Sequence, residues 1–338
     1  MTFCYPAMKN PLLTTVLLAS LTLLLTAGCE TTVNLPEPPH TPRVAVLYTL
    51  STAPQDSSFQ ELYGQRQLFI SNSQSVFNQT QLEGRPDATV ELRDAAGSVV
   101  ERYRPVARIG SGFQGRGAYR PVLGFQPLVG QAYTLRASLP GLETAESTLT
   151  IPPPTVIESA TYVPRPTDPS NPNPYEFQGH LNLVLRDDPA VANYYLAYAR
   201  VLDQQGQGGQ WSPVTVDYTK QDRTIKLGQF QLSDPQNTYN QEPYADTDVN
   251  GQRIALSADV RFSASYSCAQ GNCPPPGYIE VYVSSITAEA YNFYLSRRRY
   301  RDSQDSPFAE PAPLASNVRN GYGLFGGATD ATYRIRLF

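Results

Sequence analysis

Histidine is scarce in this chain, which has 338 residues but only His40 and His180. A Ser-His-Asp or Cys-His catalytic arrangement could therefore use very few positions, and a histidine-rich catalytic zinc site is disfavoured. Basic residues are not in excess either, because 26 lysines and arginines stand against 30 aspartates and glutamates. Nucleic-acid binding requires a basic surface, so this balance argues against nucleic acid as a partner.

Methionine is equally rare, at 2 residues, whereas proline (30) and tyrosine (22) are abundant. This balance favours short strands joined by turns over a helix bundle. Five windows alternate apolar and polar residues as half-buried strands do: 88–93, 133–137, 181–185, 279–283 and 333–337. Thr287 can cap a helix that carries aromatic and apolar residues at three- and four-residue spacing. We therefore predict a mostly β fold with one notable helix near 287–301.

The N-terminal segment has the order of an export signal. Lys9 supplies a basic residue, an apolar run covers 12–25, and the small residues Ala27 and Gly28 precede Cys29. Because the run is shorter than the about 20 apolar residues of a membrane-spanning helix, residues 1–28 are predicted to be a cleaved signal peptide. The residues Leu25-Thr26-Ala27-Gly28-Cys29 resemble a bacterial lipobox, which implies a covalent lipid on Cys29. No residue pattern indicates another cofactor.

Proline also predicts the domain organisation. Residues 29–43 are proline-rich and polar, which is typical of an extended tether between the lipid and the folded body. The remaining chain is longer than one hydrophobic core usually organises. The run Ile151-Pro152-Pro153-Pro154 then divides it into β-rich domains at 44–151 and 155–338. Five further prolines predict a surface loop over 164–174.

Two other patterns are candidate sites. Cys268 and Cys273 enclose four residues, and an exported protein lies where disulfides persist, so we predict a disulfide over a redox or metal role. Asp246, Asp248 and Asn250 match the alternating oxygen ligands that open an EF-hand calcium loop. A serine stands where that loop needs its bidentate glutamate, and an Asn-Gly hairpin turn explains the segment more simply.

The single histidine of the folded body, His180, follows a glycine at the start of an alternating strand. We interpret it as a surface residue at a strand end rather than as a general base. The asparagine- and glycine-rich segment 317–327 is interpreted as a loop that packs through Leu324 and Phe325, with a binding loop as the alternative.

Several motifs together resemble a known family. They are Asp187-Asp188-Pro189 followed by Asn193-Tyr194-Tyr195, the stretches 248–251 and 284–295, and above all 307–326 with its Asn317-x-x-Asn320-Gly321-x-Gly323-x-Phe325-Gly326 pattern. The set resembles the Bacteroidota lipoprotein family catalogued as domain of unknown function 4249, over nearly the whole mature chain. The resemblance implies an immunoglobulin-like β-sandwich at 44–151. It also implies an envelope lipoprotein often associated with TonB-dependent outer-membrane transporters, with no established activity.

We therefore expect an outer-membrane lipoprotein that is not an enzyme and that acts as a binding or interaction module. Its expected partners are the membrane, through the lipid anchor, and a TonB-dependent outer-membrane transporter, while its ligand is not indicated. Two alternatives stay open, a surface hydrolase using carboxylates and a structural or adhesion lipoprotein. Glu30 is followed by Thr31 and Thr32, where family members often carry an acidic stretch, so the periplasmic and extracellular faces both stay open.

Overall fold

The computed structural model describes residues 39–53, 66–75, 82–106, 116–166, 175–209, 211–217, 230–234, 241–264, 274–304 and 312–337. From His40 onward the chain forms one compact unit. The signal segment, Cys29, Cys268 and Cys273 lie outside the described residues, so the lipid attachment and the disulfide stay predictions.

The described part of the chain is mostly β, as predicted, and its one helix is α4 (Ala288–Gln304). The first seven strands are β1 (Val44–Ser51), β2 (Leu68–Asn72), β3 (Thr89–Asp94), β4 (Val99–Pro105), β5 (Ala118–Pro121), β6 (Ala132–Ser138) and β7 (Ala145–Thr150). The others are β8 (Val156–Arg165), β9 (Glu176–Arg186), β10 (Tyr194–Asp203), β11 (Thr215–Val216), β12 (Tyr244–Ala245), β13 (Arg253–Ser263), β14 (Pro276–Ile286) and β15 (Gly321–Arg336). Each of the five alternating windows overlaps a strand, and only Ala88 and Leu337 at their ends lie outside β3 and β15.

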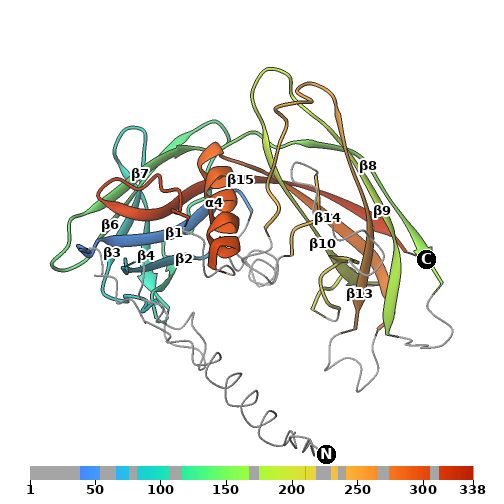
Figure 1. The fold of residues 1–338 in the computed structure, drawn as a ribbon, viewed down its shortest axis with the longest axis horizontal. Coiled ribbons are helices and arrows are strands. Elements are labelled where there is room, and N and C mark those ends of the chain that lie inside the picture. Colours follow the sequence, from blue (N-terminus) through green and yellow to red (C-terminus); the bar gives the residue numbers. More distant parts are fainter. Residues whose placement is uncertain are drawn as a thin grey trace, which may run out of the picture. The chain divides into compact units, whose positions relative to one another are not determined.

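Eleven strands form one sheet, in the order β12-β10-β14-β15-β1-β2-β5-β4-β3-β6-β7 (Figure 1). Near its middle, β15 pairs in parallel with β1 and antiparallel with β14. The large sheet therefore contains strands from both sides of the proline run at 151–154. The domain boundaries at 44–151 and 155–338 stay predictions.

The strands β1 to β7 enclose the first core. Tyr48 and Phe325 stack with ring centroids 5.9 Å apart, and both are almost completely buried there. The sheet curls until Glu146 in β7 forms a bridge with Arg319, just before β15. This part of the chain consequently has a sandwich-like layout, in agreement with the expected fold class.

The far end of the large sheet is covered on both faces. The four-stranded sheet β11-β13-β9-β8 packs on one face of β10 and β14, and α4 packs on the other (Figure 1). Thr287 accepts a hydrogen bond from the Ala290 N–H at 3.4 Å, which caps α4 as predicted. A Cβ on Gly326 would lie 3.0 Å from the Ala290 Cβ, so glycine lets the helix approach β15 closely. None of the described helical residues forms a helix long and apolar enough to span a membrane.

The asparagine- and glycine-rich motif opens β15. The Asn317 side chain donates to the Phe325 carbonyl at 2.7 Å and accepts from its N–H at 3.0 Å. Asn320 (φ 56°) and Gly323 (φ 104°) take left-handed backbone conformations that these residue types tolerate best. The expected packing of Leu324 and Phe325 is confirmed by their burial, but the expectation of a loop is wrong from Gly321 onward. The segment pairs with β1 because glycines remove the side chains that would meet its carbonyls.

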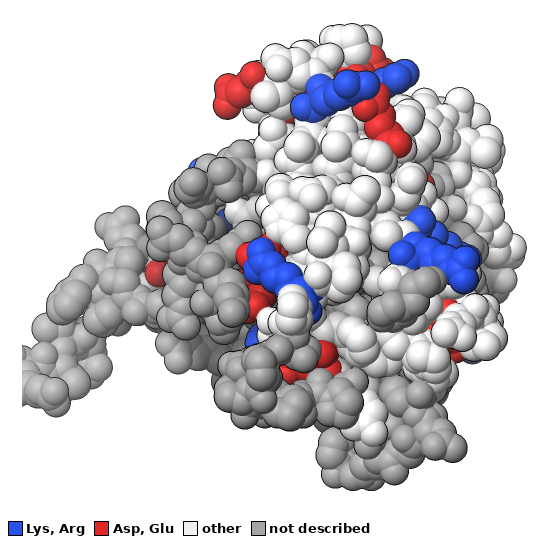
Figure 2. Space-filling view, turned by 90° about the vertical axis from the view of Figure 1, so that its right-hand side faces the viewer, with Lys and Arg blue, Asp and Glu red and all other residues white. Residues whose placement is uncertain are grey.

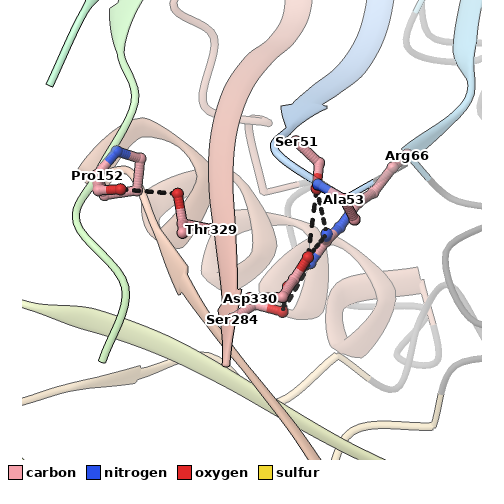
Figure 3. Close-up of polar contacts among 7 residues, drawn as sticks. All are labelled: Ser51, Ala53, Arg66, Pro152, Ser284, Thr329 and Asp330. Atoms are coloured by element: carbon pink, nitrogen blue, oxygen red, sulfur yellow. Dashed lines mark hydrogen bonds and ion pairs between the residues drawn. The ribbon is translucent and has the colours of Figure 1, made fainter. Parts of the chain in front are cut away.

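A buried ion pair ties β15 to its neighbours. Figure 3 shows the Arg66 guanidinium facing the Asp330 carboxylate, with distances of 2.7 and 2.9 Å for the two parallel hydrogen bonds. Ser51 on β1 and Ser284 on β14 each accept from the same guanidinium, at 2.9 and 2.6 Å. The preceding residue, Thr329, donates in another direction to the carbonyl of Pro152 in the proline run, at 2.8 Å. Two successive residues of β15 therefore hold four other segments: the one that contains Arg66, β1, β14 and the proline run.

Candidate functional site

The exposed side of the four-stranded sheet is the candidate site. Residues alternate strictly along β9, where Leu181, Leu183 and Leu185 face the core and their neighbours face solvent. We call the solvent side of β8, β9 and β13 the outer face. Its outward residues are Glu158, Ser159, Thr161, Val163, Arg165, Gln178, His180, Asn182, Val184, Arg186, Arg253, Ala255, Ser257, Asp259 and Arg261.

A chain of hydrogen bonds crosses this face. The His180 Nδ1 lies 2.7 Å from an Asp259 oxygen, and its Nε2 lies 2.8 Å from the Ser257 hydroxyl. His180 pairs directly with Asp259 across the two strands, and Asn182 pairs with Ser257. The interpretation of His180 as a strand-end residue is therefore wrong, because β9 begins earlier, at Glu176.

The glycine before His180 explains that error. The strand was expected to begin after Gly179, but Gly179 lies within β9 and faces inward. A Cβ at this position would lie 2.4 Å from the Tyr162 ring, so glycine makes room for the aromatic side chain of the neighbouring strand. A glycine inside a strand often marks such a close approach.

The directions of the hydrogen bonds in this network decide which chemistry its side chains can perform. The Ser257 hydroxyl donates to the Asn182 carbonyl oxygen at 2.8 Å, and the His180 Nε2 lies 2.8 Å from the same hydroxyl oxygen. A serine nucleophile gives its hydroxyl proton to the histidine, whereas the Ser257 proton points to Asn182. Arg165 holds Asp259 with two hydrogen bonds of 2.6 and 2.8 Å. Burial alone would raise the pKa of Asp259, but the hydrogen bonds from His180 and Arg165 outweigh it and lower that pKa.

A hollow of about 790 Å³ lies further along the same face. A β-bulge between Ile157 and Ser159 adds Glu158 to the lining, where Arg186 and Arg253 bind its two oxygens at 3.1 and 2.7 Å. The hydrogen bond from Arg186 is the largest cause that lowers the pKa of Glu158, so this carboxylate is ionised at neutral pH. On the side of the molecule shown in Figure 2, acidic and basic side chains lie next to one another in several groups, and uncharged surface lies between these groups.

The calcium candidates lie in the turn between β12 and β13. This turn is not a hairpin, contrary to the simpler interpretation, because β12 and β13 belong to different sheets. Asp246 is buried and accepts from the Asn193 N–H at 3.0 Å, whereas Asp248 and Asn250 are exposed. Within the described ranges no three His, Cys, Asp or Glu side chains are grouped so that they could hold a metal.

Asp246 instead has a buried carboxyl partner. Burial raises the pKa of Asp246, hydrogen bonds from Asn193 lower it, and the adjoining Asp187 carboxyl raises it again, with a net upward shift. Asp187 accepts from the Tyr195 hydroxyl at 2.6 Å and from the Gly251 N–H at 2.7 Å. The raised pKa favours the protonated form of Asp246 more than in an exposed aspartate, and the contacts of the two carboxyls join the ends of β9, β10 and β12.

A family model described as a domain of unknown function, DUF4249, matches residues 56–334. The chain belongs to the DUF4249 family. No curated protein matches the chain.

Two of the motifs that carried the DUF4249 resemblance converge in space. Asn193 and Tyr195 come from one stretch of sequence and Gly251 from another, yet all three contact the buried carboxyls of Asp187 and Asp246. In this member of the family they connect the four-stranded sheet to the large sheet. Their contacts are with one another and not with the outer face, so we assign them a structural role.

Few features of the sequence could predict the outer face of this DUF4249 member. Asp259 and Ser257 are two positions apart, which puts them on one side of a strand, but their distance from His180 in sequence is nearly 80 residues. The alternation over 181–185 could have predicted that His180 and Asn182 share a solvent side. Only the β9–β13 register shows which residues stand opposite them.

Proposed function

We propose that this DUF4249 protein is an outer-membrane lipoprotein, anchored by lipid on Cys29, that serves as a non-catalytic binding module accessory to a TonB-dependent outer-membrane transporter. The order of Lys9, an apolar run and Ala27-Gly28-Cys29 supports the anchor. The anchor would keep the folded body at the membrane, where such a transporter resides.

The outer face is the observation that most supports a binding role. Arg186 and Arg253 leave 69% and 74% of their side chains exposed while Glu158 fixes their guanidinium groups. Arginine is enriched at protein interfaces, and side chains already held in place lose less entropy when a partner binds. An array of fixed polar groups on an open sheet suits a broad partner surface better than a small substrate.

Native pull-down from detergent-solubilised outer membranes tests this role. We expect the wild-type protein to recover a transporter, and the double variant Arg186→Glu with Arg253→Glu to lose it. Arg116→Glu is the matched control, because Arg116 is also exposed and paired with a glutamate but lies outside the outer face. Recovery of no transporter, or equal recovery with both variants, would count against the proposal. Mass spectrometry of the N-terminal peptide from membranes tests the lipid on Cys29.

A surface hydrolase is the second candidate, and the linked Asp259, His180 and Ser257 side chains favour it. If these residues act on an ester, hydrolysis of a small activated ester will be lost in Ser257→Ala and His180→Ala. We expect instead the same slow background rate in wild type and both variants, because Ser257 donates to Asn182.

A further inference from the structure

An eight-residue loop between β5 and β6 presents aliphatic side chains to solvent. Val122, Leu123, Leu128 and Val129 are exposed to 52%, 56%, 64% and 44%. They are four of the eleven large hydrophobic side chains that are exposed among the described residues, and they fall within one short segment. We call residues 122–129 the aliphatic loop. Large apolar side chains exposed together in one short segment are candidates for contact with a partner or a membrane.

The backbone of the aliphatic loop is held from below by a buried carboxylate. Glu101 is 1% exposed and accepts N–H groups from Val122 at 2.9 Å, Leu123 at 2.6 Å and Phe125 at 2.8 Å. Burial alone would raise the pKa of Glu101, but the hydrogen bonds from backbone N–H groups outweigh it and lower that pKa. The carboxylate therefore stays ionised and keeps the loop fixed with its aliphatic side chains outward.

The far end of the loop is also fixed. The Leu128 N–H donates to the Tyr133 hydroxyl at 3.0 Å, and the Phe125 ring packs edge-on against the Tyr133 ring. One aromatic residue of the loop thus points into the core while the aliphatic residues point away from it. The exposure of the aliphatic side chains is a property of this folded arrangement and not of a loosely held segment.

Basic residues of β4 and β5 adjoin the start of the loop. Arg104 and Arg120 stand directly opposite each other on β4 and β5, and the Val122 N–H bonds the carbonyl of Arg102. All three arginines are exposed, and none forms an ion pair with any residue that the structure describes. Like charges directly opposite each other on neighbouring strands destabilise a sheet. An external anion would neutralise them.

We propose that the aliphatic loop inserts into the interface of a phospholipid bilayer while Arg102, Arg104 and Arg120 contact its anionic headgroups. Apolar side chains next to basic residues match the two layers of that interface. This inference rests on the proposed function in one respect, because a lipid on Cys29 would keep the body near the bilayer. The 15 residues from Cys29 to Val44 span at most about 50 Å, which limits how far the body can move away.

Tryptophan fluorescence in vesicles tests the insertion. The chain has a single tryptophan, Trp211, which is buried and can serve as the baseline. The mature lipidated chain with Leu123→Trp is reconstituted into phosphatidylglycerol and phosphatidylethanolamine vesicles with brominated acyl chains. We expect bromine to reduce the added fluorescence about twofold or more, as for a residue at the acyl boundary. Val163→Trp is the matched control, because Val163 is 57% exposed but lies on the outer face, and we expect no loss there.

The charge dependence separates the bilayer from a protein partner. Adding Arg104→Gln and Arg120→Gln to Leu123→Trp should lower the ratio of inserted to free loop about fivefold per arginine in anionic vesicles. Phosphatidylcholine vesicles should show weak quenching that the arginine changes do not alter. Leu128→Trp gives a second reading if the Leu123 variant does not fold, as judged by circular dichroism.

Quenching no greater than in Val163→Trp would overturn the inference and leave a protein as the partner of the loop. Equal quenching in both vesicle types, unaffected by the arginine changes, would overturn the role of anionic headgroups. Mass spectrometry of the same preparations reports the lipid on Cys29 separately. An unlipidated Cys29 would defeat the proposed anchor, while the loop could still be read by mixing protein with excess vesicles.

Discussion

Replacing Asp330 by asparagine should destabilise the protein more than any exposed ion-pair change. The variant keeps the volume of the side chain but removes the negative charge opposite Arg66, whose side chain is only 5% exposed. The guanidinium cannot regain water without opening the sheet. Breaking one side of a buried pair costs about 3–5 kcal/mol, because the remaining charge is left without compensation.

The geometry supports the upper part of that range. Asp330 accepts two hydrogen bonds from Arg66 and one from Ser284 at 2.5 Å. An asparagine oxygen can replace one acceptor, but its NH₂ group would face the guanidinium donors. Folded domains are stable by only about 5–15 kcal/mol, so the loss would be a large fraction of the total.

Urea unfolding followed by tryptophan fluorescence and circular dichroism measures this loss. The matched control is Asp87→Asn, since Asp87 forms a similarly short pair with Arg85 but is 45% exposed, and surface pairs contribute about 0–1 kcal/mol. A loss below about 1 kcal/mol for Asp330→Asn would refute the reasoning that this pair is desolvated and uncompensated when broken.

The same pair predicts a pH dependence. Burial alone would raise the pKa of Asp330, but the charge and hydrogen bonds of Arg66 outweigh it, so the folded-state pKa is lowered. A carboxyl group whose pKa is lowered by folding stabilises the folded state above its unfolded pKa of about 3.9. This stabilisation is lost as pH falls toward the folded pKa. Wild type should therefore lose stability below about pH 4 more steeply than Asp330→Asn. Parallel curves for the two proteins would argue against a lowered pKa.

Three further substitutions and one alkylation experiment test other parts of the structure. Glu101→Gln should cost about 1.5–3 kcal/mol and speed amide exchange in the aliphatic loop, because a charged acceptor of backbone N–H groups is lost; unchanged exchange would oppose this. The pKa of Asp246 is raised in the folded state, so its contribution to stability is complete below the unfolded pKa and is lost as pH rises through the folded pKa. Asp246→Asn should therefore be more stable than wild type at pH 7 in urea unfolding, and a loss of stability would contradict this. Gly323→Ala should cost about 3 kcal/mol or more, since its Cβ would lie 1.9 Å from a carbonyl oxygen of β1; a neutral change in Tm would rule out this close contact. Alkylation of the non-reduced mature chain should leave Cys268 and Cys273 unlabelled, and labelled thiols would exclude the disulfide.

Local patterns predicted the elements of the fold well. Alternation over 279–283 predicted β14, and the threonine at 287 with its aromatic spacing predicted α4. The same alternation was misleading about burial, because it indicates one solvated face, yet Glu280 and Tyr282 are both buried. Residues of α4 cover that face. Arg200 and Arg334 compensate the charge of Glu280, with nitrogen–oxygen distances of 2.8 and 2.7 Å. Such compensation depends on other strands and leaves no local signal.

Proline was a good guide to breaks but a poor one at a sheet edge. The predicted surface loop from position 164 starts later than expected, because β8 runs through Pro164 to Arg165. A proline lacks the N–H needed for a central strand, but β8 is the edge of its sheet and needs hydrogen bonds on one side only. The partners across the outer face depend on the register between β9 and β13. These strands are not consecutive along the chain, so no hairpin turn sets that register.

The parallel pairing of β1 with β15 has a consequence for biogenesis. Val44 and Gly321 are neighbours in the sheet but 277 residues apart in sequence. During synthesis, β1 emerges long before the strand that completes its hydrogen bonds, and contacts of such separation form slowly. Until then β1 presents an unpaired edge on which another chain could align. A chaperone that covers this edge until β15 is available would suit this topology better than folding as the N-terminal half appears.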